Sequence, residues 1–266
     1  RLAALLVFTA LPLSAQGPIS WTEAESEALR RNPELASSLA SQDAQRHAAR
    51  GSYNGLMPRV GLSNGVSDSK DSSGESRWSA DGSVNIDLFD MSRIAAIRSA
   101  HAGFDRAKAQ LWLDSAQVRL ELRRAFLELL LAQENIAVSK QIAAMRKRGA
   151  ELVSLRYESG RESRGNRLRA GAQSLQADAD LRQAERSLRV SGRALNRRIG
   201  YDELAVTTAT GTLAAAAPPE LPKETETLLS ARPELAVRQA LIKSAEAGVG
   251  SARSALWPNL AARYSR

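Results

Sequence analysis

Residues that carry enzyme or metal chemistry are scarce in this sequence. The 266 residues contain no cysteine and only two histidines, His47 and His101. Without cysteine, the chain has no disulfide, no thiolate metal site and no cysteine nucleophile. Neither histidine belongs to a cluster of ligands typical of a metal site, so we expect both to lie on the surface. The sequence therefore predicts a protein that is not an enzyme and that holds no metal or cofactor.

The polar residues that do suggest a function lie in a segment of regular alternation. Residues 77–89 alternate between polar and apolar side chains with a period of two, which predicts a β-strand with two different faces. One parity carries Asp81, Asn85 and Asp87. The other parity carries Trp78, Val84, Ile86 and Leu88. Residues 59–67 predict a second strand, with Val60 and Leu62 on its apolar parity.

Such a strand pair is typical of membrane barrels, whose strands are about ten residues long and face lipid outside and water inside. On this interpretation Asp81, Asn85 and Asp87 line the lumen, where they can influence ion preference, and the apolar parity faces lipid. An amphipathic hairpin packed on a soluble core gives the same pattern. A lone hairpin cannot close a barrel, because open sheet edges are not tolerated in lipid. Further strands must therefore come from the rest of the protein or from other chains.

Helices must position these strands on both sides. Residues 22–57 predict two helices, the first with Thr22 as its N-cap. The second has Asn32 as its cap and Pro33 in its first turn, and it ends before Pro58. These features indicate a short helical segment that leads directly into the first strand.

Residues 91–199 predict a long antiparallel helical hairpin. Its first helix extends over 92–157 without a proline and would be about 100 Å long. Its second helix covers 166–198 and ends at Gly200. Heptad spacing of apolar and alanine residues predicts close packing against neighbours on more than one side. The stripe consists of Leu111, Val118, Leu122, Ala125, Leu129, Ala132 and Ile136, broadened by Phe126, Leu127, Leu130 and Leu131.

Two short motifs recur at an offset of 200 residues. Asn-Pro-Glu-Leu-Ala at 32–36 returns as Arg-Pro-Glu-Leu-Ala at 232–236, and Leu-Met-Pro at 56–58 returns as Leu-Trp-Pro at 256–258. An internal repeat indicates a fold built twice from one plan. We therefore divide the chain into a first repeat (16–200), a connector (201–222) and the start of a second repeat (223–266). The second copy stops as its strand region begins, so we expect a fragment that does not form a closed pore by itself.

The N-terminus indicates that the protein is exported. Residues 1–15 combine an apolar run with a small-residue ending, as in the remnant of a secretory signal peptide. No other apolar stretch approaches the length of a transmembrane helix.

The net charge is +8, but the arginines alternate with acidic residues along the helices, and no aromatic residues that could stack on bases lie between them. This composition argues against nucleic-acid binding.

The order of these parts resembles that of the TolC-like outer-membrane efflux protein family. The motifs that carry the resemblance are 32–35 with 232–235, the Leu-x-Pro pairs at 56 and 256, the strand end 84–90, the Arg-Tyr-Glu-Ser-Gly turn at 156–160 and the hairpin end at 195–200. The resemblance covers essentially the whole chain after the signal segment. It implies that this chain corresponds to about the first half to two thirds of a family member.

The resemblance implies a homotrimer whose protomers each give four strands to a shared barrel in the outer membrane, with a periplasmic helical extension. It implies a passive conduit for efflux or type I secretion, driven by an inner-membrane pump through a periplasmic adaptor. The adaptor contact then lies at the hairpin tip, on Arg156, Tyr157, Gly160 and Ser163. Residues 161–169 depart from the family pattern with several arginines, which leaves the adaptor's identity open. A periplasmic coiled-coil adaptor or scaffold protein is the alternative, and the sequence does not reveal the cargo.

Overall fold

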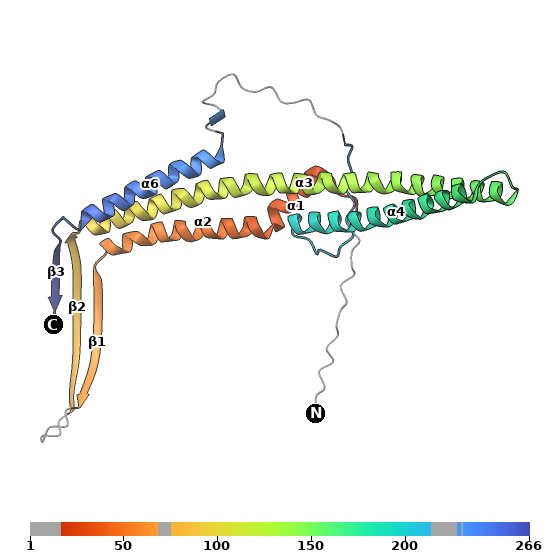
Figure 1. Cartoon of the computed structure of the whole chain (residues 1–266). Coiled ribbons are helices and arrows are strands. Elements are labelled where there is room, and N and C mark those ends of the chain that lie inside the picture. The colour runs from red at the N-terminus through yellow and green to blue at the C-terminus, as the bar shows by residue number, and fades with distance from the viewer. Residues whose placement is uncertain (1–16, 69–75, 214–227, 230) are drawn as a thin grey trace, which may run out of the picture. The chain divides into compact units, whose positions relative to one another are not determined.

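The computed structural model describes residues 17–68, 76–213, 228–229 and 231–266 (Figure 1). The predicted signal segment 1–15 and most of the second half of the connector lie outside the described residues. The chain is mostly helical, with one three-stranded sheet, which confirms the predicted fold class. The described residues divide into two compact units, one formed by 17–36 with 116–213 and the other by 37–68 and 76–115 with 228–229 and 231–266.

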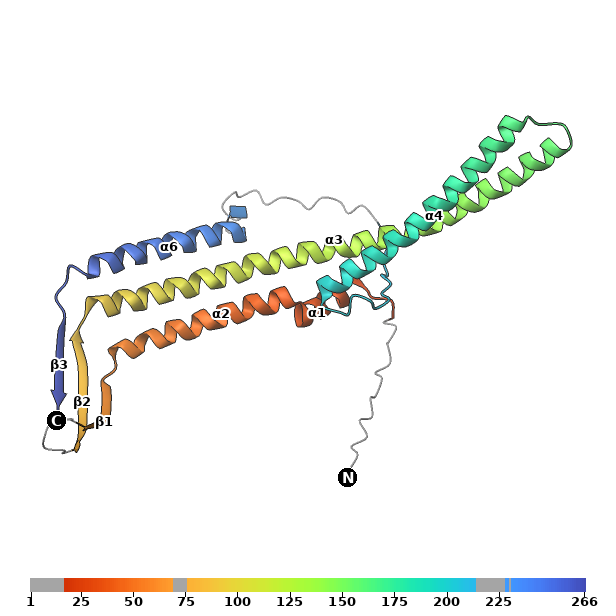
Figure 2. The same cartoon turned by 60° about the horizontal axis from the view of Figure 1, so that its bottom comes forward.

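The first unit is built around the helical hairpin. Helix α3 (Met91–Glu158) contributes its C-terminal part and α4 (Arg164–Ile199) returns beside it, as both views show (Figure 2). Helix α1 (Trp21–Arg31) packs against the end of α4. No helix in the described ranges is both long and apolar enough to cross a membrane.

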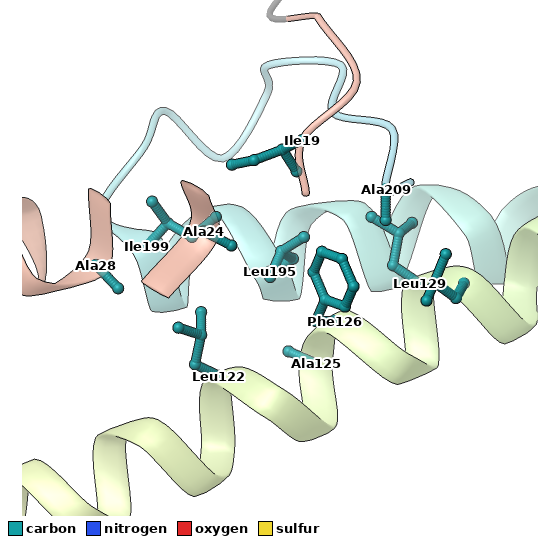
Figure 3. Packing of buried hydrophobic residues seen from close by; sticks show 11 residues of the cluster. Ile19, Ala24, Ala28, Leu122, Ala125, Phe126, Leu129, Leu195, Ile199 and Ala209 are labelled. Carbon is teal, nitrogen blue, oxygen red and sulfur yellow. The ribbon is translucent and has the colours of Figure 1, made fainter. Parts of the chain in front are cut away.

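A hydrophobic cluster joins these helices at the base of the hairpin, which we define as the part of α3 and α4 that packs against α1. Ala24 and Ala28 of α1 meet side chains from α3 and α4 (Figure 3). The largest fully buried apolar side chains of this cluster are Leu122, Leu129, Leu195 and Ile199. The small alanines let α1 approach the larger leucines closely, which favours dense packing. Within the predicted heptad stripe, Phe126 and Leu130 are buried, whereas Leu127 and Leu131 remain exposed.

The ends of α1 are set by two polar caps. The N-cap is Ser20, not Thr22 as predicted, because Ser20 and Glu23 form a reciprocal capping box. At the other end, the Asn32 side chain accepts a hydrogen bond from the Leu35 amide at 2.9 Å. This confirms Asn32 as the cap of α2 (Pro33–Gly51). The Asn32 amide group also donates to the Arg198 carbonyl at 2.7 Å, which ties the junction to the end of α4.

The second unit holds the sheet. After α2 the chain tightens into the 3₁₀ helix η1 (Ser52–Leu56), so the α-helix ends earlier than Pro58 alone indicated. Strands β1 (Arg59–Asp68), β2 (Ser76–Phe89) and β3 (Leu260–Ser265) follow. They form an antiparallel sheet in the order β1-β2-β3. Helix α6 (Pro233–Ser254) precedes β3, as α2 precedes β1.

Candidate functional site

The sheet has one apolar face across all three strands. Residues paired across the ladder share a face, and Val60 lies opposite Val84, which lies opposite Tyr264. Ile86 lies opposite Ala262 on the same face. Leu62 and Trp78 also belong to this face. Leu62 is 87% exposed and Trp78 is 65% exposed, so no described part of the chain covers them. The face that the sequence predicted as lipid-facing is therefore a largely apolar surface in the isolated chain, interrupted by Asn64 opposite Ala80.

The opposite face of the sheet is polar. Arg59 of β1 lies opposite Asn85, and Arg263 of β3 lies opposite Asn85 from the other side. The Arg263 guanidinium donates to the Asn85 side-chain oxygen at 2.7 Å. Asp81 lies opposite Ser63 and is exposed. The third strand thus continues the two-faced pattern of the first two, although it lies some 170 residues further along the chain.

Asp87 differs from Asp81 because it sits between two arginines. Its Oδ2 atom lies 3.1 Å from Arg59 Nη2 and 2.7 Å from Arg93 Nε. Arg93 also approaches Asp90, which accepts a hydrogen bond from the Ser92 amide at the start of α3. Asp87 therefore ties the start of β1 to the start of α3. Sequence reasoning missed Arg59 and Arg93, because their pairing depends on the strand register.

The tip of the hairpin is a glycine turn. Gly160 adopts φ 74°, in the left-handed region that glycine favours. Its amide donates to the Tyr157 carbonyl, and the Arg161 amide donates to the Arg156 carbonyl, so the last carbonyls of α3 are satisfied. The Arg167 guanidinium lies 4.4 Å from the centre of the Tyr157 ring, which joins the two helices across the turn.

The start of α4 is also held by polar contacts at this tip. Ser163 is the N-cap and accepts a hydrogen bond from the Asn166 amide. Glu162 accepts from the Asn166 side chain at 2.6 Å and from the Ser163 amide at 3.0 Å. These hydrogen bonds, the one from Asn166 first, lower the pKa of Glu162 below its usual value. Of the four predicted contact residues, Tyr157, Gly160 and Ser163 thus help to shape the turn, and the Arg156 side chain is exposed.

The two histidines lie outside these surfaces. His47 is exposed, and the exposed ring of His101 forms a hydrogen bond of 3.0 Å with the Tyr53 hydroxyl. Within the ranges that the structure describes, no group of three histidine or acidic side chains is placed to hold a metal ion.

A family comparison decides what this combination of hairpin and two-faced sheet represents. The model of the outer membrane efflux protein family matches residues 25–201. The chain belongs to this family. The resemblance read from the short motifs is therefore confirmed, and the family is one of efflux proteins rather than of enzymes.

Relatives of known sequence or structure agree with the outer membrane efflux protein fold. The cobalt-zinc-cadmium resistance protein CzcC of Cupriavidus metallidurans is 26% identical over 249 residues, which cover 94% of this chain and 58% of CzcC. The crystal structure of the CmeC outer membrane channel of Campylobacter jejuni matches with a TM-score of 0.79 at 15% identity, over 92% of this chain and 56% of CmeC. The outer membrane protein VceC of Vibrio cholerae matches with a TM-score of 0.71 at 20% identity, over 92% of this chain and 62% of VceC.

The chain thus spans somewhat more than half the length of these relatives. At these identities the solved structures establish the fold of the efflux protein.

Proposed function

We propose that this protein is the outer-membrane channel of a tripartite efflux or type I secretion system. It acts as a passive trimeric conduit from the periplasm to the exterior, with the strands in the membrane and the helical hairpin in the periplasm. An inner-membrane pump supplies the energy and an adaptor joins pump and channel. Family membership favours this role over the alternative of a periplasmic adaptor or scaffold protein.

The observation that supports the proposal best is the largely apolar face of the three-stranded sheet. An uncovered apolar surface that extends over three strands is unfavourable in water and favourable against lipid chains. The opposite face offers arginine, aspartate, asparagine and serine side chains to water. Strands of ten and fourteen residues are long enough to span the bilayer core when tilted.

The polar face also suggests which residue influences the ion preference of the conduit. On the polar face Asp87 is neutralised by two arginines and Asn85 accepts from Arg263, whereas Asp81 has no such partner among the described residues. Asp81 is then the lumen residue with the largest effect on ion preference. Arg156, Tyr157, Gly160 and Ser163 at the tip are the proposed contacts with the adaptor.

Single-cysteine labelling tests the assignment of the two faces directly, because these 266 residues contain no cysteine. Neighbouring variants such as Val84→Cys and Asn85→Cys are made in the full-length protein in native outer membranes. A charged, water-soluble thiol reagent is expected to label cysteine at positions 81 and 85 and to spare positions 84 and 86. Equal labelling of both parities would remove the membrane assignment.

The name of one relative suggests a cargo class. CzcC is named for resistance to cobalt, zinc and cadmium, and we propose divalent metal cations as a cargo of this channel. A strain that lacks the gene is then expected to become sensitive to these metals and to recover on complementation. Sensitivity only to organic drugs or detergents would reject the metal cargo while leaving the channel role intact.

A further inference from the structure

The positive charge of the chain is concentrated in the helical hairpin. Residues 116–199 contain 18 lysines and arginines and nine acidic residues, a net charge of +9, whereas the whole chain carries +8. The rest of the sequence is therefore close to neutral. The even interleaving of charges expected from the sequence does not hold on α4, where residues 182–198 contain six arginines and one glutamate.

Five of these arginines form a single line along α4, which we call the arginine stripe. Their spacing of four, three, four and four residues keeps them within about 80° of arc on a helix with 3.6 residues per turn. The stripe consists of Arg182, Arg186, Arg189, Arg193 and Arg197, all exposed. It extends over about 22 Å at 1.5 Å per residue. Leu188, Leu195 and Ile199 lie on the other side of α4, toward the hydrophobic cluster.

The stripe is only sparsely neutralised within the chain. Arg197 lies 3.4 Å from Glu203, and Arg186 donates to the Gln183 side chain. Within the described residues, no carboxylate pairs with Arg182, Arg189 or Arg193. Like charges three and four residues apart destabilise an isolated helix, so this arrangement opposes the folding of α4 rather than supporting it.

Arg198 shows what a structural arginine looks like in the same helix. It is adjacent to Arg197 in sequence but lies on the packed side, half-buried between Glu34 at 3.0 Å and Glu121 at 2.8 Å. The members of the stripe have no such setting. No ion pair within the described residues accounts for their spacing.

The surface beside the stripe is suited to close approach by another helix. Val190 is 65% exposed and presents an apolar side chain next to the arginines. Ser187 beside it is also exposed and short. An apolar contact flanked by charges is the arrangement by which helices pack side by side and select their partners. A flexible polyanion does not require the alternation of three and four residues.

We propose that the arginine stripe binds an α-helix of a partner protein that carries carboxylates at the same three- and four-residue spacing. The proposal rests on the proposed function, because the partner is then a periplasmic component of the efflux assembly. The binding site is the exposed face of α4 between Arg182 and Arg197, which is separate from the tip residues 156–163. Charge complementarity along four helical turns gives the interaction its register.

A pair of synthetic peptides tests the proposal on the full chain. The first is an alanine-based helix with five glutamates at the spacing of the stripe, and the second has the same composition with the glutamates distributed around the helix. We expect the first peptide to bind about tenfold more tightly than the second, since several ion pairs of modest strength act together. We also expect its affinity to fall as the salt concentration rises.

Two triple variants of equal charge change locate the site. Arg182→Glu, Arg189→Glu and Arg193→Glu together are expected to weaken binding of the first peptide about tenfold or more. Arg161→Glu, Arg164→Glu and Arg169→Glu together, in the hairpin turn and the first turns of α4, are expected to leave it within about twofold. If circular dichroism shows that charge reversal unfolds the helix, the corresponding Arg→Gln variants are used instead of the Arg→Glu variants.

Three outcomes overturn the proposal: equal affinity for both peptides, an equal loss in both triple variants, or tighter binding of heparin than of the first peptide, which would indicate a general polyanion surface. The labelling pattern of positions 81–86 is independent of the stripe. It therefore shows separately whether the channel assignment itself has failed.

Discussion

The base and the tip of the helical hairpin contain similar leucines in opposite surroundings. At the base, Leu129 and Leu195 are fully buried against α1 and the residues that follow α4. Toward the tip, Leu175 is 69% exposed and Leu168 is 58% exposed, although the heptad spacing continues. The same pattern of residues thus produces a core only where a third element covers the two helices.

This difference shows which part of the hairpin the chain can stabilise with its own residues, without a partner. Two helices bury one side of each other, and apolar residues on the remaining sides need further partners. At the base α1 supplies that cover. Near the tip the described residues supply none, so the leucines there remain exposed in the isolated chain and would contact neighbouring subunits if the proposed trimer forms.

The largest expected effect comes from truncating a leucine at the base. Leu129→Ala should lower the free energy of unfolding by about 2–5 kcal/mol, because it leaves a cavity in a closely packed cluster. Leu175→Ala should cost less than about 1 kcal/mol in the isolated chain. Urea unfolding followed by circular dichroism measures both. Equal losses would mean that the tip is as tightly packed as the base.

Glycine substitutions at the two ends should differ next. A Cβ atom at Gly200 would overlap with the Arg31 carbonyl oxygen, and φ is 91°. Gly200→Ala should therefore cost about 2–3 kcal/mol through strain and displacement of α1.

Gly160→Ala is the matched control for this clash. Gly160 also has a positive φ, but nothing lies within 4 Å of its Cβ position. It should cost about 1–2 kcal/mol, the left-handed conformation alone. Thermal unfolding of the two variants under the same conditions would separate the clash from the backbone term. A larger loss at Gly160 would contradict the comparison.

The buried Asn196 should give a somewhat smaller loss than Gly200, and the exposed Asn166 a smaller one still. Asn196 is fully buried, donates to the carbonyls of Asp202 and Ala205, and accepts from the Thr207 hydroxyl at 2.6 Å. Asn196→Ala should cost about 1–3 kcal/mol because these buried groups lose their partner. Asn166→Ala at the exposed tip should cost about 0.5 kcal/mol or less. Hydrogen exchange of residues 200–210 should increase only in the Asn196 variant.

The smallest effect concerns pH at the tip. The pKa of Glu162 is lowered by hydrogen bonds to its charged form, so its stabilising contribution is complete at neutral pH and is lost as the pH falls through that lowered pKa. An NMR titration of the carboxyl group should show a midpoint below that of an ordinary glutamate. In Asn166→Ala the midpoint should rise toward the ordinary value, because the main hydrogen bond is gone. An unchanged midpoint would assign the shift to another group.

Several elements could be predicted because they depend on local periodicity. A period of two from Val60 to Leu88 indicated strands with two faces, and long proline-free segments indicated the hairpin. Asn32 as a cap and Gly200 as a helix end followed from well-known preferences at helix termini. The N-cap of α1 was assigned two residues too late, because Ser20 and Thr22 both precede a glutamate at capping-box spacing and only the reciprocal hydrogen bonds distinguish them.

Other features had no local signal. Asp81 and Asp87 occupy the same parity of one strand, yet only Asp87 meets arginines from β1 and α3. The sequence by itself determined the helical hairpin and the two-faced strands, since each follows from residue spacing along a continuous segment, and its separate motifs carried the resemblance to the family. The tertiary structure decided which leucines form a core, which carboxylates are neutralised and which arginines remain exposed. Those outcomes depend on contacts between residues far apart in the chain, and only folding brings such residues together.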